Sequence, residues 1–387
     1  MKTEHAEGAR PPSRGTVLGA VGGLIDRART LEGLEHHGLQ LLAAQRWRAL
    51  GKPLPGRLLA QERLTAGISL AAAAVLNQIR AAYNGDLLLL KGPEVAVAYP
   101  DQALRPYGDV DLLVSDSHAA QLALIGAGFE PLGDERRYVR LHHQRPLRLP
   151  GLPLLVEVHH APKWPDGLEP PSTAELLEAA EPARCGIEGI LGLPAAHHAI
   201  VLAAHAWADA PLGSLRQLLD IALLAADAGR ADWTGLAKRW GASHLWETTV
   251  AALNALFGSA RSPTTLRLWA RHLASVRERT VLEKHLTCWL SPLWCFSRSE
   301  GLRECAAAFT GDLRPLPGEP WRQKLVRTGL ALRNASVSAS RHFAAVQERG
   351  LDHDGPEAFR SAGGPGTTGA AHATPTRAAS VAAPARR

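Results

Sequence analysis

The chain has 387 residues, of which 46% are hydrophobic and 21% charged, the proportions of an ordinary globular protein with room for two or three domains. The formal net charge of +6 is too small to indicate a polynucleotide-binding surface, so nucleic acid is not expected as a partner, although an anionic substrate would not be repelled. No uninterrupted apolar run reaches the roughly 18 residues of a membrane helix, and we expect no membrane partner. The four cysteines show no CxxC pairing and no secretory signal precedes them, which predicts reduced thiols and a cytoplasmic location.

The N-terminal part of the chain is predicted to be helical after a short leader. Residues 1–14 are polar, with paired prolines and no periodicity, so we expect them to be disordered. From Leu18 to about Tyr83, leucine and isoleucine recur at the spacing of amphipathic helices. Pro53 and Pro55 interrupt this pattern. The sequence therefore predicts two or three helices before the first strand.

A strand followed by a glycine turn is predicted next. Residues 86–91, DLLLLK, form a short apolar strand that ends at Gly92. Pro93 suits the first position of a helix, where its missing N–H group costs nothing. A strand, a glycine turn and a helix N-terminus together present backbone N–H groups to an anion, and Lys91 would add a full positive charge. An ordinary strand-to-helix turn with a surface lysine is the alternative.

The following strand, residues 108–114, carries two acidic side chains on one face. Asp109 and Asp111 flank Val110 within an apolar run. Because successive side chains of a strand point to opposite faces, both carboxylates point the same way and are near enough to share a metal ion. Two acids on a buried strand are costly unless positive charge lies between them. Arg105 lies in the loop before this strand.

A third acid, Glu157, lies in a later apolar strand over residues 152–160. Alternation places Glu157 and His159 on the same face of that strand. A helix at His118–Gly126 and another strand at about Arg137–Leu149 are predicted between the two acidic strands. The order of strand, helix, strand and strand suggests a small mixed sheet with helices on one face.

Helices are expected to fill the C-terminal half, and no strand is predicted after Pro162. Arg216 and Asp220 are four residues apart on one of these helices, a spacing at which they could form an ion pair. Whether these two residues and His205 form a structural network or contact an acceptor is left open. From Leu351 the chain is rich in Gly, Ala, Pro and Thr, which predicts a disordered tail.

Three carboxylates on neighbouring strands make a hard-oxygen site of the kind that Mg²⁺ prefers, with Mn²⁺ as the alternative. Beside a glycine turn and a lysine that can hold phosphate, such a site suits phosphoryl or nucleotidyl transfer, with two ions bridging the acids and a nucleoside triphosphate. Asp109 and Asp111 would bind metal, and Glu157 would bind metal or act as a general base. The candidate nucleotide contacts are Lys91, Gly92, Arg105 and His159.

The stretches LLKGPEVAVAYP, LRPYGDVDLLV and LVEVHH resemble the DNA polymerase β-type nucleotidyltransferase superfamily, in which a glycine turn, an Asp-x-Asp strand and a third strand acid define the active site. Within it, the similarity is to a bacterial group called the uncharacterised nucleotidyltransferase family and runs from about Leu31 to Gly258. The superfamily commonly has Gly-Ser at the phosphate turn, whereas this chain has Lys91-Gly92-Pro93. The resemblance implies a helical region on each side of the catalytic core.

We therefore predict an α+β fold, in which a small mixed-sheet nucleotidyltransferase core is flanked by N-terminal and C-terminal helical regions. In chain order the predicted parts are a leader (1–14), an N-terminal helical region (15–83), the catalytic core (84–165), a C-terminal helical region (166–350) and a tail (351–387). The predicted reaction moves a nucleoside monophosphate from a triphosphate to a hydroxyl, amine or phosphate of an acceptor, either a small molecule or a protein or peptide. Two other classes stay open, namely a catalytically inactive nucleotide-binding or partner module on the same fold and a toxin–antitoxin component.

Overall fold

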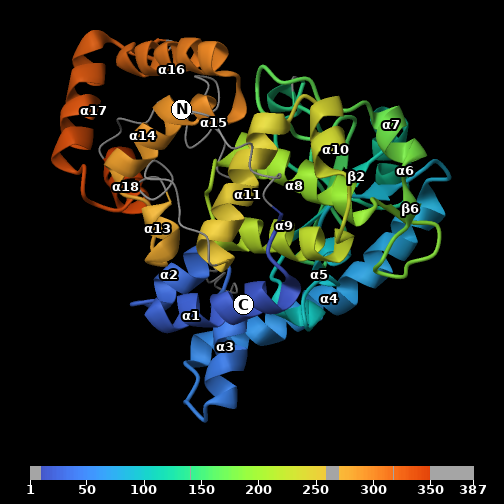
Figure 1. The fold of residues 1–387 in the computed structure, drawn as a ribbon. Coiled ribbons are helices and arrows are strands. Elements are labelled where there is room, and N and C mark those ends of the chain that lie inside the picture. Colours follow the sequence, from blue (N-terminus) through green and yellow to red (C-terminus); the bar gives the residue numbers. More distant parts are fainter. Residues whose placement is uncertain (1–9, 140, 259–269, 317, 349–387) are drawn as a thin grey trace, which may run out of the picture.

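The computed structural model describes residues 10–139, 141–258, 270–316 and 318–348. A seven-stranded mixed sheet lies among helices that come from both ends of the chain (Figure 1). This architecture confirms the α+β class and the flanking helical regions. The predicted tail and most of the predicted leader lie outside the described residues.

From residue 10, where the description begins, four helices precede the sheet, where two or three were predicted: α1 (Arg14–Arg27), α2 (Leu31–His36), α3 (Gln40–Ala49) and α4 (Gly56–Ala82). The side-chain oxygens of Ser13 and Thr30 cap the first two by accepting hydrogen bonds from backbone N–H groups three residues on. The predicted proline break separates α3 from α4, since Pro55 is the N-cap residue of α4.

The longest of these helices, α4, has 27 residues and contributes to the core around the sheet. Among the described residues it alone is long and apolar enough, by length and composition, to cross a membrane, which the search for uninterrupted apolar runs did not detect. Its buried side chains in the C-terminal half pack in one cluster with strand residues, and they are Ile68, Ala72, Val75, Leu76 and Ile79. Packing through one side is typical of a helix that covers the core of a globular domain, and such a helix can be as long and as apolar as a membrane helix.

The sheet has the strand order β3-β4-β5-β2-β1-β7-β6. Its strands are β1 (Leu88–Leu89), β2 (Asp109–Leu113), β3 (Glu130–Pro131), β4 (Leu147–Arg148), β5 (Leu155–His159), β6 (Glu181–Pro182) and β7 (Leu191–Gly192). At its centre β2 and β5 run parallel, with Asp111 paired to Glu157. Since β1 pairs antiparallel with β2 and parallel with β7, the sheet is mixed as predicted.

Two expectations about the strands are wrong. The hairpin of β6 and β7 follows Pro162 and extends the sheet beyond β1, where the N–H group of Leu191 donates to the carbonyl of Leu87. The strand predicted over Arg137–Leu149 is reduced to the two residues of β4, and a 3₁₀ helix covers Glu135–Arg137. Strands of two residues offer too few alternating positions to be recognised in a sequence.

Apolar side chains cover both faces of the sheet, whereas the sequence predicted helices on one face only. One core cluster joins α4 and α6 (Ser117–Gly126) to Leu89 and Leu112. The other joins the N-terminal helices, α8 (Ala195–Asp209) and α9 (Leu215–Ala228) to Leu88 and Leu113. Because Leu113 and Asp111 are two residues apart on β2, Asp111 points toward the face that the second cluster covers.

In the described part of the chain the other α-helices are α5 (Pro93–Ala96), which follows β1, and, after β5, α7 (Thr173–Glu178), α10 (Trp233–Arg239), α11 (Ser243–Phe257), α13 (Arg271–Ala274), α14 (Val281–Leu290), α15 (Pro292–Cys295), α16 (Arg298–Leu313), α17 (Trp321–Arg333) and α18 (Ala339–Glu348). Helices α14 to α18 gather on the side of the molecule away from α6 and β6 (Figure 1). Trp294 of α15 links them to the rest of the chain. Its ring packs edge-on against that of Trp207, with 5.7 Å between centroids, and its carbonyl accepts a hydrogen bond from the Thr248 hydroxyl.

A buried ion pair ties α9 to the loop before β2. Arg105 donates to the carboxylate of Asp220 through Nε at 2.9 Å and Nη2 at 2.8 Å. The Tyr99 hydroxyl also donates to Asp220, at 2.7 Å. Arg216, the predicted partner of Asp220, donates instead to the carbonyl of Pro106 at 2.9 Å. The ion pair expected within one helix is thus replaced by one between distant segments.

Replacing Asp220 with Asn should lower the free energy of unfolding by about 3 kcal/mol or more, because it leaves the Arg105 guanidinium buried without a counter-charge. Chemical denaturation followed by circular dichroism measures the loss. Glu130→Gln is the control, since it removes only the exposed pair with Arg148 and should cost less than about 1 kcal/mol. Equal losses in the two variants would contradict the importance of the buried pair.

The turn after β1 requires glycine at position 92. Gly92 has φ +65° and ψ −127°, a conformation that L-residues avoid. A Cβ at this position would lie 2.9 Å from Cγ1 of Val110 and 3.1 Å from the carbonyl oxygen of Asp109. The absence of a side chain therefore lets the turn pass directly against β2.

Gly92→Ala should destabilise the protein by more than Gly51→Ala. Gly51 also has a positive φ, of +67°, but a Cβ there would meet nothing within 4 Å. The Gly51 variant therefore measures the cost of a positive φ alone, on the order of 1 kcal/mol, and the further loss at Gly92 measures its ψ of −127° together with the collision with β2. Thermal unfolding of both variants gives this difference, and a loss at Gly92 no larger than at Gly51 would show that the turn can move away from β2.

Candidate functional site

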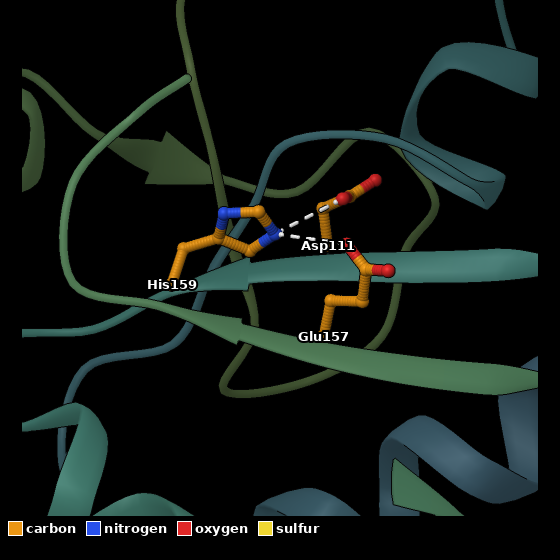
Figure 2. Close-up of side chains that lie close together, drawn as sticks. All are labelled: Asp111, Glu157 and His159. Atoms are coloured by element: carbon orange, nitrogen blue, oxygen red, sulfur yellow. Dashed lines mark hydrogen bonds and ion pairs between the residues drawn. The ribbon is translucent and has the colours of Figure 1, made fainter. Parts of the chain in front are cut away.

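The two central strands bring four candidate side chains to one face of the sheet. Asp109 and Asp111 come from β2, and Glu157 and His159 come from β5. In the parallel pairing Asp111 lies opposite Glu157, so their side chains are direct neighbours. Figure 2 shows Asp111, Glu157 and His159 converging on a common point.

The converging group differs by one member from the predicted set of three acids. Each of Asp111, Glu157 and His159 offers one ligand atom within 4.8 Å of the other two. His159 Nε2 donates to Asp111 Oδ1 at 3.0 Å and lies 3.6 Å from Glu157 Oε2. Asp111 and His159 are each only 2% exposed. Asp109 shares the strand face but lies outside this group, in which His159 takes the place expected for it.

Opposing charges determine how these groups ionise. Burial opposes ionisation of Asp111, but Lys91 and the hydrogen bond from His159 outweigh burial and hold the pKa of Asp111 well below its usual range. Burial, together with the nearby Asp111 charge, raises the pKa of Asp109. For His159, burial favours the neutral ring, but the two carboxylates outweigh burial and raise its pKa. The acids that attract a proton to His159 would attract a metal ion in the same way.

The donor atoms fit a divalent cation. Asp111 Oδ2 is buried and has no hydrogen-bond partner among the described residues, and His159 turns its Nε2 atom toward both carboxylates. A buried carboxylate oxygen without a partner is costly, and a cation would compensate it. Two carboxylates suit Mg²⁺, while the added imidazole suits a first-row ion such as Mn²⁺.

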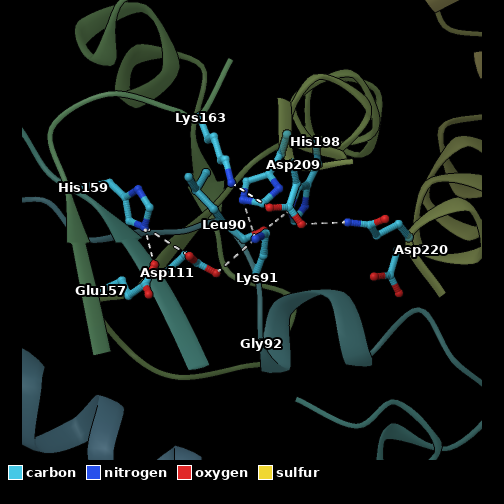
Figure 3. Close-up of polar contacts among 12 residues, drawn as sticks. Leu90, Lys91, Gly92, Asp111, Glu157, His159, Lys163, His198, Asp209 and Asp220 are labelled. Carbon is cyan, nitrogen blue, oxygen red and sulfur yellow. Dashed lines mark hydrogen bonds and ion pairs between the residues drawn. The ribbon is translucent and has the colours of Figure 1, made fainter. Parts of the chain in front are cut away.

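Lys91 faces these acids from the turn after β1. Its Nζ lies 3.7 Å from Asp111 Oδ2 (Figure 3). It also donates to Nε2 of His205, on α8, at 2.6 Å. Burial and the Lys91 charge hold the pKa of His205 well below its usual range, so the neutral ring can accept this hydrogen bond. Of the three helical residues whose role the sequence left open, His205 therefore contacts the site directly.

The turn that carries Lys91 is held from behind by buried side chains. His198 Nε2 donates to the carbonyl of Leu90 at 2.6 Å, and Arg105 Nη1 donates to the carbonyl of Gly92 at 3.4 Å. Arg105 is 5% exposed and its other nitrogens are engaged in the ion pair with the carboxylate on α9. The structure thus places Arg105 as a support for the turn, away from the phosphate contact that the sequence suggested.

A second lysine near the site was missed in the sequence. Lys163 follows β5 and donates to Asp209 Oδ1 at 2.8 Å, on the side of the site that α8 covers (Figure 3). After burial and the charge of Lys91, the charge of Lys163 further lowers the pKa of His205, which accepts the hydrogen bond from Lys91. In the sequence, Lys163 could have been noticed as a basic residue four positions after the end of the strand that carries Glu157.

A histidine doublet also belongs to this site. The rings of His142 and His143 each lie 5.2 Å from that of His159, measured between centroids. Burial and the neighbouring His159 lower the pKa of His142 to about 2, which keeps that ring neutral. The doublet was visible in the sequence, but only the bridge between His143 and His159 brings it to the acidic strand.

Comparison with known proteins concerns the same part of the chain. A family model described as uncharacterised nucleotidyltransferase matches residues 25–258, more than half of the chain. The match includes the whole sheet, the converging acids and α8, whereas α13 to α18 lie beyond it. No curated protein and no solved structure matches the chain. The chain belongs to the uncharacterised nucleotidyltransferase family.

Proposed function

We propose that the chain transfers a nucleoside monophosphate from a nucleoside triphosphate to an acceptor and releases pyrophosphate, in the manner of the DNA polymerase β-type superfamily. The observation that carries the proposal is the pair of acids on adjacent parallel strands, Asp111 and Glu157, with Lys91 facing Asp111 at 3.7 Å. Family membership supports nucleotide transfer in general. The four cysteines are free thiols, which supports a cytoplasmic location.

Asp111, Glu157 and His159 would hold a divalent cation, Mg²⁺ or Mn²⁺, with Asp109 as an additional carboxylate on the same strand face. Such an ion, when bound, neutralises the charge between the acids and the triphosphate and polarises the phosphoryl group. Glu157 is the most exposed of the three, with 20% of its side chain accessible. It is therefore our candidate for accepting a proton from the acceptor.

Lys91 and Lys163 would balance the charge of the triphosphate. Both are partly exposed, with 19% and 18% of their side chains accessible, so a phosphate can reach them. Lys91 is positioned by the Gly92 turn and by His205. The neutral His205 ring accepts a hydrogen bond from the ammonium group and leaves its positive charge in place. Fixed cations close to the reacting phosphate stabilise negative charge that develops during transfer.

The acceptor is proposed to be a small molecule or a protein or peptide that offers a hydroxyl, amine or phosphate. Helix α8 borders the site through His205 and through Asp209, which also binds Lys163. The acceptor would therefore enter between α8 and the sheet, because the helix supplies polar groups on that side.

Asp111→Asn should reduce nucleotidyl transfer by about a thousandfold or more, since it removes the charge that the cation site is built around. The enzyme is incubated with each nucleoside triphosphate labelled at the α-phosphate, together with a cell extract that supplies acceptors. The wild type should move the label to an acceptor, and the variant should not.

The same reaction with γ-labelled triphosphate separates two chemistries. Transfer of the γ-label would mean phosphoryl transfer and would contradict the proposal. Triphosphate binding with neither label transferred, in all extracts tried, would favour the inactive nucleotide-binding module. Glu247→Gln is the matched control, since it removes a carboxylate from an exposed position on α11.

Metal binding can be tested without any acceptor. Titration of Mn²⁺ followed by electron paramagnetic resonance should show binding to the wild type and at least about a tenfold weaker affinity for Asp111→Asn and Glu157→Gln. The Glu247→Gln control should bind as the wild type does. Equal affinities in all four proteins would place the ion elsewhere.

A further inference from the structure

Helix α17 lies at the outer edge of the molecule and beyond the residues that match the family (Figure 1). Its large apolar side chains Trp321, Leu325 and Leu332 are 62%, 67% and 73% exposed. Their spacing of four and seven residues places them on one side of the helix. Single exposed apolar residues are ordinary, but three on one side of a helix indicate a surface that a partner covers.

Ion pairs hold another side of α17 against the protein. Lys324 is 6% exposed, donates to the carbonyl of Asp312 and lies 3.8 Å from Oδ1 of the same residue. Arg327 donates to both carboxylate oxygens of Glu319, through Nε and Nη2 at 3.0 Å each. The helix thus keeps two charged side chains inside and turns three large apolar ones outward, the reverse of an ordinary surface helix. Because these two cations are compensated within the protein, they do not select the partner.

The exposed apolar surface continues onto α16. Leu313 is 51% exposed and lines the same cavity as Trp321, Leu325 and Leu332. These four side chains therefore lie close together, although two helices supply them. We call them the apolar patch.

Exposed arginines border the apolar patch. Arg322 and Arg333 each directly follow a member of the patch, so they lie on the adjacent side of α17. Both are exposed, and neither forms an ion pair within the parts of the chain that the structure describes. The 13 residues of α17 include four basic residues and no acidic one.

The net charge of the chain is concentrated in the same region. Residues 270–348 hold twelve basic and seven acidic residues, a net charge of +5, while the whole chain has +6. Positive charge gathered in one part of a chain indicates an anionic partner for that part.

We propose that α17 docks on the surface of an anionic lipid bilayer, with the apolar patch inserted among the lipid chains and Arg322 and Arg333 beside lipid phosphates. Leucine and tryptophan on one side of a helix, next to arginine, are typical of helices that lie in the membrane interface. Such a helix needs no apolar run of spanning length, the feature whose absence led us to expect no membrane partner. Anionic lipids line the cytoplasmic leaflet, which agrees with the proposed location.

Other partners fit this surface less well. Nucleic acid would engage the two arginines but would leave the exposed leucines in water. A second copy of the chain, placed face to face on the apolar patch, would bring arginines of the same charge toward one another. Only an anionic surface with an apolar interior satisfies both parts of α17.

Vesicle sedimentation of the full chain without nucleotide tests the docking. The chain should bind phosphatidylcholine vesicles that contain about 30% phosphatidylserine at least about tenfold more tightly than vesicles of phosphatidylcholine alone. Salt at about 0.5 M should reduce this difference, because it screens the arginines. Equal affinity for the two kinds of vesicle, or binding to neither, would overturn the proposal.

Two double variants separate the apolar and the charged contact. Leu325→Ser with Leu332→Ser should weaken binding to the phosphatidylserine vesicles by about tenfold or more, since less apolar surface leaves water. Arg322→Gln with Arg333→Gln should also weaken it by about tenfold or more, while the weak affinity for phosphatidylcholine vesicles stays nearly unchanged.

Matched controls make the same changes elsewhere. Leu122→Ser alters a leucine that is 56% exposed on α6, and Arg63→Gln alters an exposed arginine on α4. Both controls should bind as the wild type does, and circular dichroism checks that every variant is folded. Unchanged vesicle binding in the double leucine variant would place the contact elsewhere and contradict the proposal.

Two further outcomes would replace the membrane with another partner. If vesicles are not bound and light scattering shows a dimer that the double leucine variant converts to a monomer, the apolar patch is a contact between copies of the chain. If vesicles are not bound and a short single-stranded RNA is, with loss of that binding in the double arginine variant, the partner is nucleic acid. None of these measurements uses a nucleoside triphosphate, so their failure is independent of the proposed transfer activity.

Discussion

Asp111 is a buried carboxylate that stays ionised, and it therefore requires positive charge close by. At 2% exposure it receives almost no help from water, so positive charge must come from protein groups or from a bound cation. Lys91 and His159 supply part of it, at 3.7 Å and 3.0 Å. One of its oxygens still has no hydrogen-bond partner among the described residues, which makes this position the most favourable one on the central strands for a divalent ion.

The position of Lys91 depends in turn on buried contacts behind its turn. Gly92 allows the turn to approach β2, while Arg105 supports its carbonyl and is itself fixed by Asp220 of α9. His198 of α8 supports the preceding carbonyl. The helices of the C-terminal half are therefore part of the site's construction, because without α8 and α9 the lysine turn would lose its supports. The matched family region extends past the sheet to residue 258 and so includes both helices.

Local patterns in the sequence predicted the elements that depend on neighbours along the chain. Helix spacing, proline breaks and the alternation of β2 and β5 were sufficient for the fold class and for the shared face of Asp111 and Glu157. The two-residue strands β6 and β7 were not predicted. Strand β6 pairs with β7, and β7 pairs with the distant β1, so these strands depend on contacts that their own composition does not reveal. The helices on the second face of the sheet were not predicted for a similar reason, because they come from both ends of the chain and meet only in the folded protein.

By itself the sequence determined that Asp109 and Asp111 share one face of their strand and that Glu157 and His159 share one face of theirs, because alternation sets the face of a side chain whatever strand lies beside it. Only the tertiary structure decided which of them converge. Strand register brings His159 into the group and leaves Asp109 outside it. The partner of Asp220 was likewise decided by packing, since a buried guanidinium pairs with the carboxylate that the fold brings near, and Arg105 is nearer than Arg216 despite its distance along the chain.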